Sequence, residues 1–482
     1  MDTISSVGHT PELVFPGSRQ EVVAALTPPL SLSYADEDLD ADTRLAHDHF
    51  RAGIPLSLTT AEQLARKLTR PANPPQHPDL EVRAALLLAA GRYVHPDCSA
   101  DLSASDTAGQ AQHLVSSLLT DPPHIRLPLL RHILSVSLPP SFKSHPKINP
   151  ETGRVLARPR GGDSGLNDWF DESEADARSW RRQAGLANVV KVVIEALEPG
   201  EVEDVWPLLL PPLLAYLDDF ESGNKLVGMS LLDSLLDKTD ESLLRRTGVG
   251  KVFEKSLENA FSALSDPLSP RLLARAHPVA LKLLNQQYPP PPPSPAADDS
   301  ARFDALCTLL SSSVIHTWEF KSSHVALETV SCAALPALLD ALRGGSIRFL
   351  QILVPHLCEL LSGTATSGGT GEGTWTGETV EMMRRAANAL EAVVRNAKPR
   401  MARWEGRIGA AIGMCWIAAR ESEGARRLGE ADGREALQHL KEALRSVARA
   451  LDEALSTSLA HERSSARDPA LEGLFPTRPV PQ

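Results

Sequence analysis

Apolar side chains recur with helical spacing from about residue 60 to about residue 456, and no stretch of comparable length alternates with the period of two that a strand shows. This pattern predicts an all-α chain. In residues 189–197, five apolar side chains share one helical face, namely Val189, Val190, Val193, Ile194 and Leu197. In residues 435–455, six apolar residues follow one another at steps of three or four, namely Leu437, Leu440, Leu444, Val447, Leu451 and Leu455.

A recurring proline pattern refines this prediction. Pro128, Pro211, Pro336 and Pro355 each follow an apolar residue and precede leucines at positions +2 and +6. Proline is favoured in the first turn of a helix, and leucines four apart lie on the same helical face. We therefore expect each proline to open a helix of one recurring type. Pairs of such helices bury both apolar faces only by stacking on neighbouring pairs, so the sequence predicts an α-solenoid of divergent HEAT- or armadillo-like helix pairs.

Interruptions in the helical pattern predict the domain organisation. Residues 139–172 lack an apolar stripe and are expected to form an exposed loop, and the five consecutive prolines near residue 290 predict a stiff linker. The expected segments are an N-terminal region at 1–138 that is partly disordered and then helical, the loop at 139–172, central repeats at 173–288, the linker at 289–299, C-terminal repeats at 300–456 with a Gly-rich loop at 363–377, and a flexible tail at 457–482. Apart from a short helix near residues 21–26, we expect the first 55 or so residues to pack poorly. Leu471, Leu474 and Phe475 in the tail could order on a partner.

Charge and cysteine content restrict the classes of function. The 482 residues contain 49 Lys plus Arg against 61 Asp plus Glu, which gives a net charge of -12 and argues against a protein held mainly by nucleic-acid phosphates. The five cysteines form no CxxC motif and no cluster with histidine, so we expect buried thiols in a reducing compartment. Neither a secretory signal nor a run of 18 apolar residues occurs. We therefore expect a cytoplasmic protein without membrane insertion, and leave the nucleus open as a second location.

Candidate catalytic motifs are each incomplete. Residues 161–165 read Gly-Gly-Asp-Ser-Gly, but the serine-protease chemistry that this resembles needs two β-barrels. The glycines of residues 369–374 lack the lysine of a phosphate-binding loop. His47 and His49 lie two residues apart, on different sides of a helix, and no third metal ligand follows them. We therefore predict no catalytic, cofactor-binding or metal site and a protein that is not an enzyme.

One segment carries a specific resemblance. Residues 206–261 contain Leu-Pro-Pro-Leu-Leu with two acidic residues after the helix, then Lys-x-x-Gly with paired leucines, and then Leu-Leu-Arg-Arg-Thr-Gly-x-Gly-x-Val-Phe. The order of these pieces resembles the Tel-two-interacting protein two family, and residues 334–361 and 386–400 look like its downstream portion. The resemblance covers residues 180–420, about half of the chain. The candidate motif and partner-binding residues are Asp218, Asp219, Lys225, Arg245, Arg246, Gly248, Gly250, Phe253, Arg395, Arg400, Trp404 and Trp416.

The resemblance implies a non-catalytic scaffold, the smaller Tti subunit of the triple-T co-chaperone complex. Such a subunit binds the larger Tti solenoid directly and the Tel-two subunit through it, and works with the ninety-kilodalton heat-shock chaperone to mature phosphatidylinositol-kinase-like kinases. An armadillo- or importin-like adaptor and a helical metal-dependent hydrolase are the alternatives. From the residues themselves, Gly248 predicts a left-handed helix C-cap. Trp404, Trp416 and the long last helix lead us to expect much of the interface after residue 300.

Overall fold

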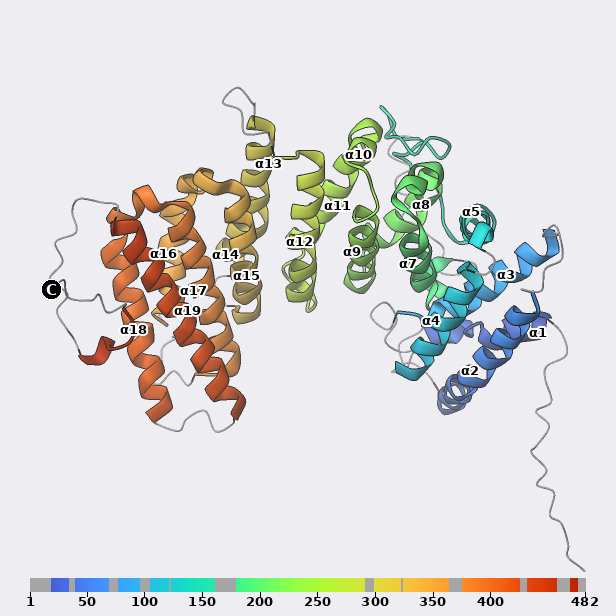
Figure 1. Cartoon of the computed structure of the whole chain (residues 1–482), viewed down its shortest axis with the longest axis horizontal. Coiled ribbons are helices and arrows are strands. Elements are labelled where there is room, and N and C mark those ends of the chain that lie inside the picture. Colours follow the sequence, from blue (N-terminus) through green and yellow to red (C-terminus); the bar gives the residue numbers. More distant parts are fainter. Residues whose placement is uncertain are drawn as a thin grey trace, which may run out of the picture. The chain divides into compact units, whose positions relative to one another are not determined.

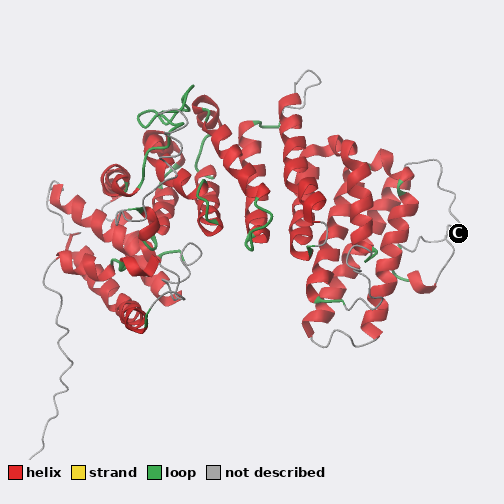
Figure 2. Ribbon diagram, turned by 180° about the vertical axis from the view of Figure 1, so that it is seen from behind, coloured by secondary structure: helices red, strands yellow, loops and turns green. Residues whose placement is uncertain are grey.

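The computed structural model describes residues 19–33, 40–68, 77–95, 105–120, 123–160, 179–290, 299–321, 324–363, 375–424, 431–456 and 469–475. Within these ranges every regular element is a helix, as Figure 2 shows, and the one extended pairing is an isolated antiparallel bridge between Ile148 and Val155. Helices near one another in sequence pack together within the N-terminal and within the C-terminal part of the chain (Figure 1). The prediction of an all-α solenoid is confirmed.

The chain divides into two compact units, and unit 1 comprises Met1–Asp219 and Ser230–Val249. Tyr93 and Asn188 connect its helices through buried hydrogen bonds, since the Tyr93 hydroxyl donates to the Leu26 carbonyl (2.6 Å) and the Asn188 amide donates to the Arg92 carbonyl (2.6 Å). The helix predicted around residues 189–197 is α7, and its apolar face is buried. The helices of unit 1 are α1 (Arg19–Leu26), α2 (Ala41–Leu68), α3 (His77–Ala90), α4 (Ser105–Thr120), α5 (Arg126–His132), α7 (Leu186–Ala196), α8 (Val202–Leu217), the later part of α9 (Ser222–Leu236) and α10 (Glu241–Thr247).

Unit 2 comprises Phe220–Met229 and Gly250–Gln482. In its C-terminal part α17 packs between α15 and α19, while α16 packs against α17 and α18, which gives the two helical layers of a repeat array (Figure 1). Besides the start of α9, its helices are α11 (Val249–Ser262, whose first residue belongs to unit 1), α12 (Ser269–Gln287), α13 (Ser300–Leu310), α14 (His316–Lys321), α15 (Val325–Leu342), α16 (Leu350–Leu361), α17 (Gly377–Asn396), α18 (Glu405–Gly424) and α19 (Ala431–Ser456).

The recurring prolines occupy different helical positions from those expected. Pro128 lies in the first turn of α5, as predicted, but Pro211, Pro336 and Pro355 lie inside α8, α15 and α16. An internal proline removes one backbone hydrogen bond and costs about 3 kcal/mol. The helices nevertheless extend upstream, because the turns before each proline bury apolar side chains such as Trp206. The leucines at +2 and +6 from all four prolines are buried, so the expected apolar face is confirmed.

Three segments expected to be loose or exposed are packed in part. Residues 41–55 belong to the helix α2 and bury His47 and Ile54, although most of their side chains are exposed. In the described part of the predicted exposed loop, 139–160, Phe142 and Ile148 are buried, while Val155 is 39% exposed and residues 157–160 are exposed, as expected. Residues 469–475 of the predicted flexible tail are also placed, with Leu474 buried. Short apolar anchors of this kind do not produce the long periodic stripe on which the predictions rested.

The span Val325–Leu361 is long and apolar enough to cross a membrane by length and composition alone. It comprises α15, a 3-10 segment (Arg343–Phe349) and α16, and both α-helices pack on α17. Buried core helices share this composition. The thiols Cys307, Cys332, Cys358 and Cys415 are buried and unbridged, as expected, while Cys98 lies outside the described residues.

Candidate partner-binding surfaces

The Arg-Arg-Thr-Gly sequence closes α10 in unit 1. The Asp240 carboxylate caps the start of α10 by accepting a hydrogen bond from the Ser242 N–H (2.6 Å). At the other end Gly248 adopts φ 73° and its N–H donates to the Leu244 carbonyl (3.1 Å), which confirms the predicted left-handed C-cap. The side chains of Arg245 and Arg246 are about half exposed. A helix of seven residues thus ends in a defined corner that presents two arginines.

The described part of the predicted loop, residues 139–160, packs onto this corner. The Val155 N–H donates to the Thr247 carbonyl (3.0 Å), and the Trp206 indole N–H donates to the Gly153 carbonyl (3.1 Å). Gly153 has φ 61°, and a Cβ there would lie 2.5 Å from Trp206 Cδ1, so only glycine fits. We call residues 142–156 the arm. The motif corner therefore holds a segment of its own chain.

The two acidic candidates anchor unit 1 internally. The Asp219 side chain is fully buried and pairs with Arg181 (2.8 Å). Asp218 lies 3.7 Å from His145 of the arm, and burial lowers the pKa of His145 to about 4, so that imidazole is neutral at pH 7. The contact between Asp218 and His145 is consequently not an ion pair near neutrality. These two aspartates hold the unit together and present little surface to a partner.

Two of the motif residues in unit 2 are also buried. Phe253 is fully buried, and a Cβ on Gly250 would lie 2.5 Å from the Cδ of Gln287. Gln287 in turn donates to Glu254 (2.7 Å), so the close approach at Gly250 lets α12 reach α11. The third, Lys225, is half-buried. We infer a packing role for Gly250 and Phe253.

The C-terminal candidates differ in exposure. Arg395 donates to both oxygens of Asp340 (2.8 and 2.9 Å), which ties α17 to α15. Arg400 is exposed and Trp404 is half-buried, with the Arg403 guanidinium 5.7 Å from the centre of its ring. Arg400 and Trp404 therefore remain accessible for a partner, while Arg395 serves an internal ion pair.

Trp416, the remaining candidate, is 2% exposed because the chain itself covers it. The segment at 469–475 packs over this part of α18, with Gly473 adopting φ 82° beside the indole. Trp416 in α18 is thus a packing residue in the chain as it stands. Lys441 and Arg445 of α19 and the segment at 469–475 all lie against its ring, and no local pattern around Trp416 could indicate these distant residues.

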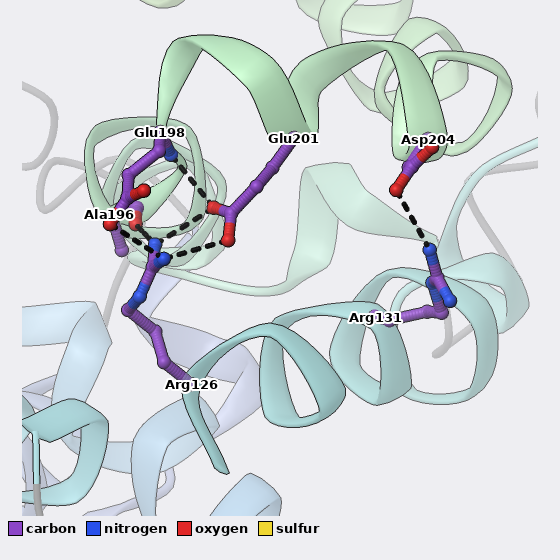
Figure 3. A network of polar contacts seen from close by, with 6 residues as sticks. All are labelled: Arg126, Arg131, Ala196, Glu198, Glu201 and Asp204. Carbon is purple, nitrogen blue, oxygen red and sulfur yellow. Dashed lines mark hydrogen bonds and ion pairs between the residues drawn. The ribbon is translucent and has the colours of Figure 1, made fainter. Parts of the chain in front are cut away.

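A polar network that sequence reasoning missed centres on Arg126 of α5 (Figure 3). Its guanidinium donates to both carboxylate oxygens of Glu201 (2.7 and 2.9 Å), to Glu198 (2.8 Å) and to the Ala196 carbonyl at the end of α7 (2.5 Å). Glu198 and Glu201 also form a capping box ahead of α8. The capping sequence is visible before α8, but nothing local indicates an arginine about 70 residues upstream.

One groove in unit 2 has a volume of about 280 Å³ and lies among α11, α12 and α13. Leu257, Phe261 and Leu283 contribute apolar surface to it, and Lys251 and Glu258 are polar members of its lining. Lys251 pairs with Glu254 (2.8 Å) and Glu258 pairs with Lys255 (2.9 Å), so the charges along this edge are mutually neutralised. The groove is therefore a concave, largely apolar surface whose charged residues Lys251 and Glu258 are each paired with an opposite charge.

The candidate metal ligands and glycine-rich motifs can be followed only in part of the chain. No group of three or more His, Cys, Asp or Glu residues there could hold a metal ion. His47 is buried in α2 and forms a hydrogen bond with Ser31 (2.8 Å), while His49, two residues further along the same helix, is exposed. The glycine-rich candidates at 161–165 and 369–374 lie outside the described residues.

Stacked helix pairs whose motif residues are mostly internal define a helical-repeat solenoid protein. Within that class the family is shown by the sequence itself. The model of the Tti2 family matches residues 86–366, more than half of the chain, and the chain belongs to this family. The match begins almost a hundred residues earlier than the resemblance first indicated and stops before α17.

Other comparisons extend to the fold alone. No curated protein matches the chain. Among solved structures, Kap121p bound to Pho4p is 14% identical over 92% of this chain and 41% of its own, with a TM-score of 0.38. Kap121p bound to RanGTP is 13% identical over 91% of this chain and 42% of its own (TM-score 0.39), and importin beta is 11% identical over 92% and 62% (TM-score 0.26). The chain spans less than half the length of Kap121p.

Proposed function

We propose that this protein is a non-catalytic scaffold, the smaller Tti subunit of a Tel-two/Tti co-chaperone complex. The observation that carries the proposal is the family match over residues 86–366. An array of helix pairs offers long exposed faces suited to another extended helical protein. In this role the chain binds the larger Tti solenoid directly and the Tel-two subunit through it, and the assembly serves the ninety-kilodalton chaperone in maturing phosphatidylinositol-kinase-like kinases. It acts in the cytoplasm, and the nucleus is a second location to examine.

The first test is co-purification of the tagged full chain from its native cells, with stoichiometric partners identified by mass spectrometry. We expect the larger Tti subunit and the Tel-two subunit. Recovery of the protein alone, or with transport cargo, would refute the proposal and favour the adaptor alternative. Metal analysis of the same preparation addresses the hydrolase alternative, because stoichiometric zinc, iron or manganese would contradict a scaffold role.

The interface can be mapped with exposed residues, which avoids deleting packed repeats. We expect Arg400→Glu with Trp404→Ala in unit 2 to reduce recovery of the larger subunit, because both side chains remain accessible. Arg245→Glu in unit 1 is the matched charge reversal, and its side chain is 48% exposed. If the double variant and the unmodified chain recover the larger subunit equally well, the interface does not include residues 400–404. A selective loss with Arg245→Glu would instead place it at the α10 corner.

A further inference from the structure

A short C-terminal segment is seated on the last helix pair of unit 2. We call residues 469–475 the strap; it begins with one 3-10 turn, Pro469–Leu471, and continues through a hydrogen bond from the Leu474 N–H to the Leu471 carbonyl (3.1 Å). Leu474 is 1% exposed. Leu471 lies against Gly413 of α18, and Leu474, three residues on, is buried after the left-handed turn at Gly473. The strap is thus a Leu-x-x-Leu segment bound to a helical surface.

The surface beneath the strap has the features of a peptide groove. On α18, Gly413, Trp416 and Arg420 follow at steps of three and four and share one face. A Cβ on Gly413 would lie 3.3 Å from Leu471 Cδ2, so glycine makes room for the leucine, and Trp416 adds an apolar wall. The Arg445 guanidinium from α19 lies 4.9 Å from the centre of the Trp416 ring.

Two arginines hydrogen-bond to the backbone of the strap. Arg420 donates to the Ala470 carbonyl (3.1 Å), and Arg445 Nε donates to the Gly473 carbonyl (3.0 Å). Backbone carbonyls are present in every peptide, so these two arginines select for chain direction and turn geometry and leave side-chain selectivity to the leucine sites. We call this site, formed by Gly413, Trp416, Arg420 and Arg445, the strap groove.

Two apolar side chains next in sequence to the contact residues remain exposed. Met414, which follows Gly413 in α18, is 53% exposed, and Phe475, the last residue of the strap, is 41% exposed. A segment this short has no stability of its own and is ordered by the surface that holds it. The 12 residues 457–468 connect it to α19, and chain connections of this length give effective concentrations on the order of millimolar. A partner segment with better contacts can therefore compete with the strap.

We propose that the strap groove is a docking site for a Leu-x-x-Leu segment of a protein partner, and that the strap occupies it in competition with that partner. The groove takes Leu471 beside Gly413 and holds the backbone at Ala470 and Gly473 with Arg420 and Arg445. The proposal concerns one groove of the purified chain, so its test is independent of the co-chaperone role.

The test uses the strap itself as the probe. A labelled peptide of residues 467–478 is titrated by fluorescence anisotropy against the full chain and against a variant lacking residues 469–482. We expect saturable binding to the shortened variant and at least about tenfold weaker binding to the full chain, because the tethered strap competes at millimolar effective concentration. A peptide with Leu471→Ser and Leu474→Ser is the control and should bind neither.

Two further variants locate the binding site. In the shortened chain Gly413→Leu should abolish peptide binding by filling the leucine site, whereas Gly409→Leu on the same helix should not, since nothing lies within 4 Å of a Cβ at Gly409. If the shortened chain fails to fold, the full chain with Leu471→Ser and Leu474→Ser replaces it. Absence of peptide binding to a folded strap-free variant, or equal affinity with and without the strap, would overturn the proposal. Unfolding of both variants would also overturn it, because the strap would then be a fixed part of the core.

Discussion

Replacing Arg126 by alanine tests whether α5 is held to the corner between α7 and α8 by one side chain. The Arg126 side chain is 22% exposed and that of Glu201 is 18% exposed, so their contact is largely shielded from water. The guanidinium also satisfies the Ala196 carbonyl at the end of α7, one of the groups that a helix terminus leaves without an intrahelical partner. Removing the side chain leaves both the carboxylate and this carbonyl without their main donor.

The expected cost follows from these contacts. A hydrogen bond that involves a charged group contributes about 1.5–3 kcal/mol, and the bonds of one guanidinium are not additive. We therefore expect Arg126→Ala to lower the free energy of unfolding of unit 1 by about 3 kcal/mol. Arg126→Lys keeps the charge but cannot reproduce the planar fork that contacts two oxygens of Glu201, so we expect it to recover about half of the loss.

Arg131 on the same helix provides the matched control. It lies 3.6 Å from Asp204, and both side chains are more than half exposed, so Arg131→Ala should cost at most about 0.5 kcal/mol (Figure 3). Calorimetry of the full chain measures both variants, and about 3 kcal/mol corresponds to a fall of roughly 6–12 °C in the midpoint of a cooperative unit of about 150–250 residues. Equal midpoints for the two variants would refute the reasoning, because shielding from water would then make no difference.

Three further predictions concern burial. Burial lowers the pKa of His277 to about 4 from an ordinary value of 6.5, so near pH 5 the unfolded chain binds a proton that the folded chain does not. The free energy of unfolding should therefore fall as the pH drops from about 6.5 toward 4. When that free energy is measured against pH, His277→Leu should reduce the slope by about one proton. Gly153→Ala should lower the free energy of unfolding by about 2–4 kcal/mol in chemical denaturation, because Gly153 has a positive φ and an added Cβ would collide with Trp206. Gly200→Ala is the control and should cost under about 1 kcal/mol, because nothing lies within 4 Å of a Cβ there. Equal costs would contradict the close-approach argument. In a Cys98→Ser variant no thiol should react rapidly with a disulfide reagent at pH 8 before unfolding, because burial raises the pKa of the remaining cysteines, to about 11 for Cys358 and about 12 for Cys415; rapid reaction of the native chain would refute this.

The fold was predictable because helical periodicity is a local property. The apolar face of α7 and the stripe of α19 are both visible in single segments, and both are buried as expected. The starts of α8, α15 and α16 were not predictable from their prolines, because proline position depends on how much apolar surface the preceding turn buries. Tertiary burial decides that balance, and a local pattern does not contain it.

The candidate surfaces were predictable only in part, for the same reason. The cap at Gly248 follows from its sequence neighbours and is present. The arm on Thr247 and the strap beside Trp416 involve residues that are distant in sequence and carry only a few apolar anchors. A segment that contributes one or two buried residues has no periodicity to detect, so its docking site becomes visible only when the fold is known.

The most distinctive part of the family motif is more readily explained by folding than by partner contact. Phe253 is buried, Gly250 admits Gln287, and Gly248 ends α10 where Thr247 receives the arm. Each of these positions constrains how consecutive helices meet, which is a structural role whichever partner the protein binds. The partner surface should therefore be sought among the accessible residues of the motif, such as Arg245, and beyond the matched region, at Arg400, Trp404 and the strap groove. The residues of the family motif then determine how the helices pack, and the exposed faces of the helices determine which partner binds.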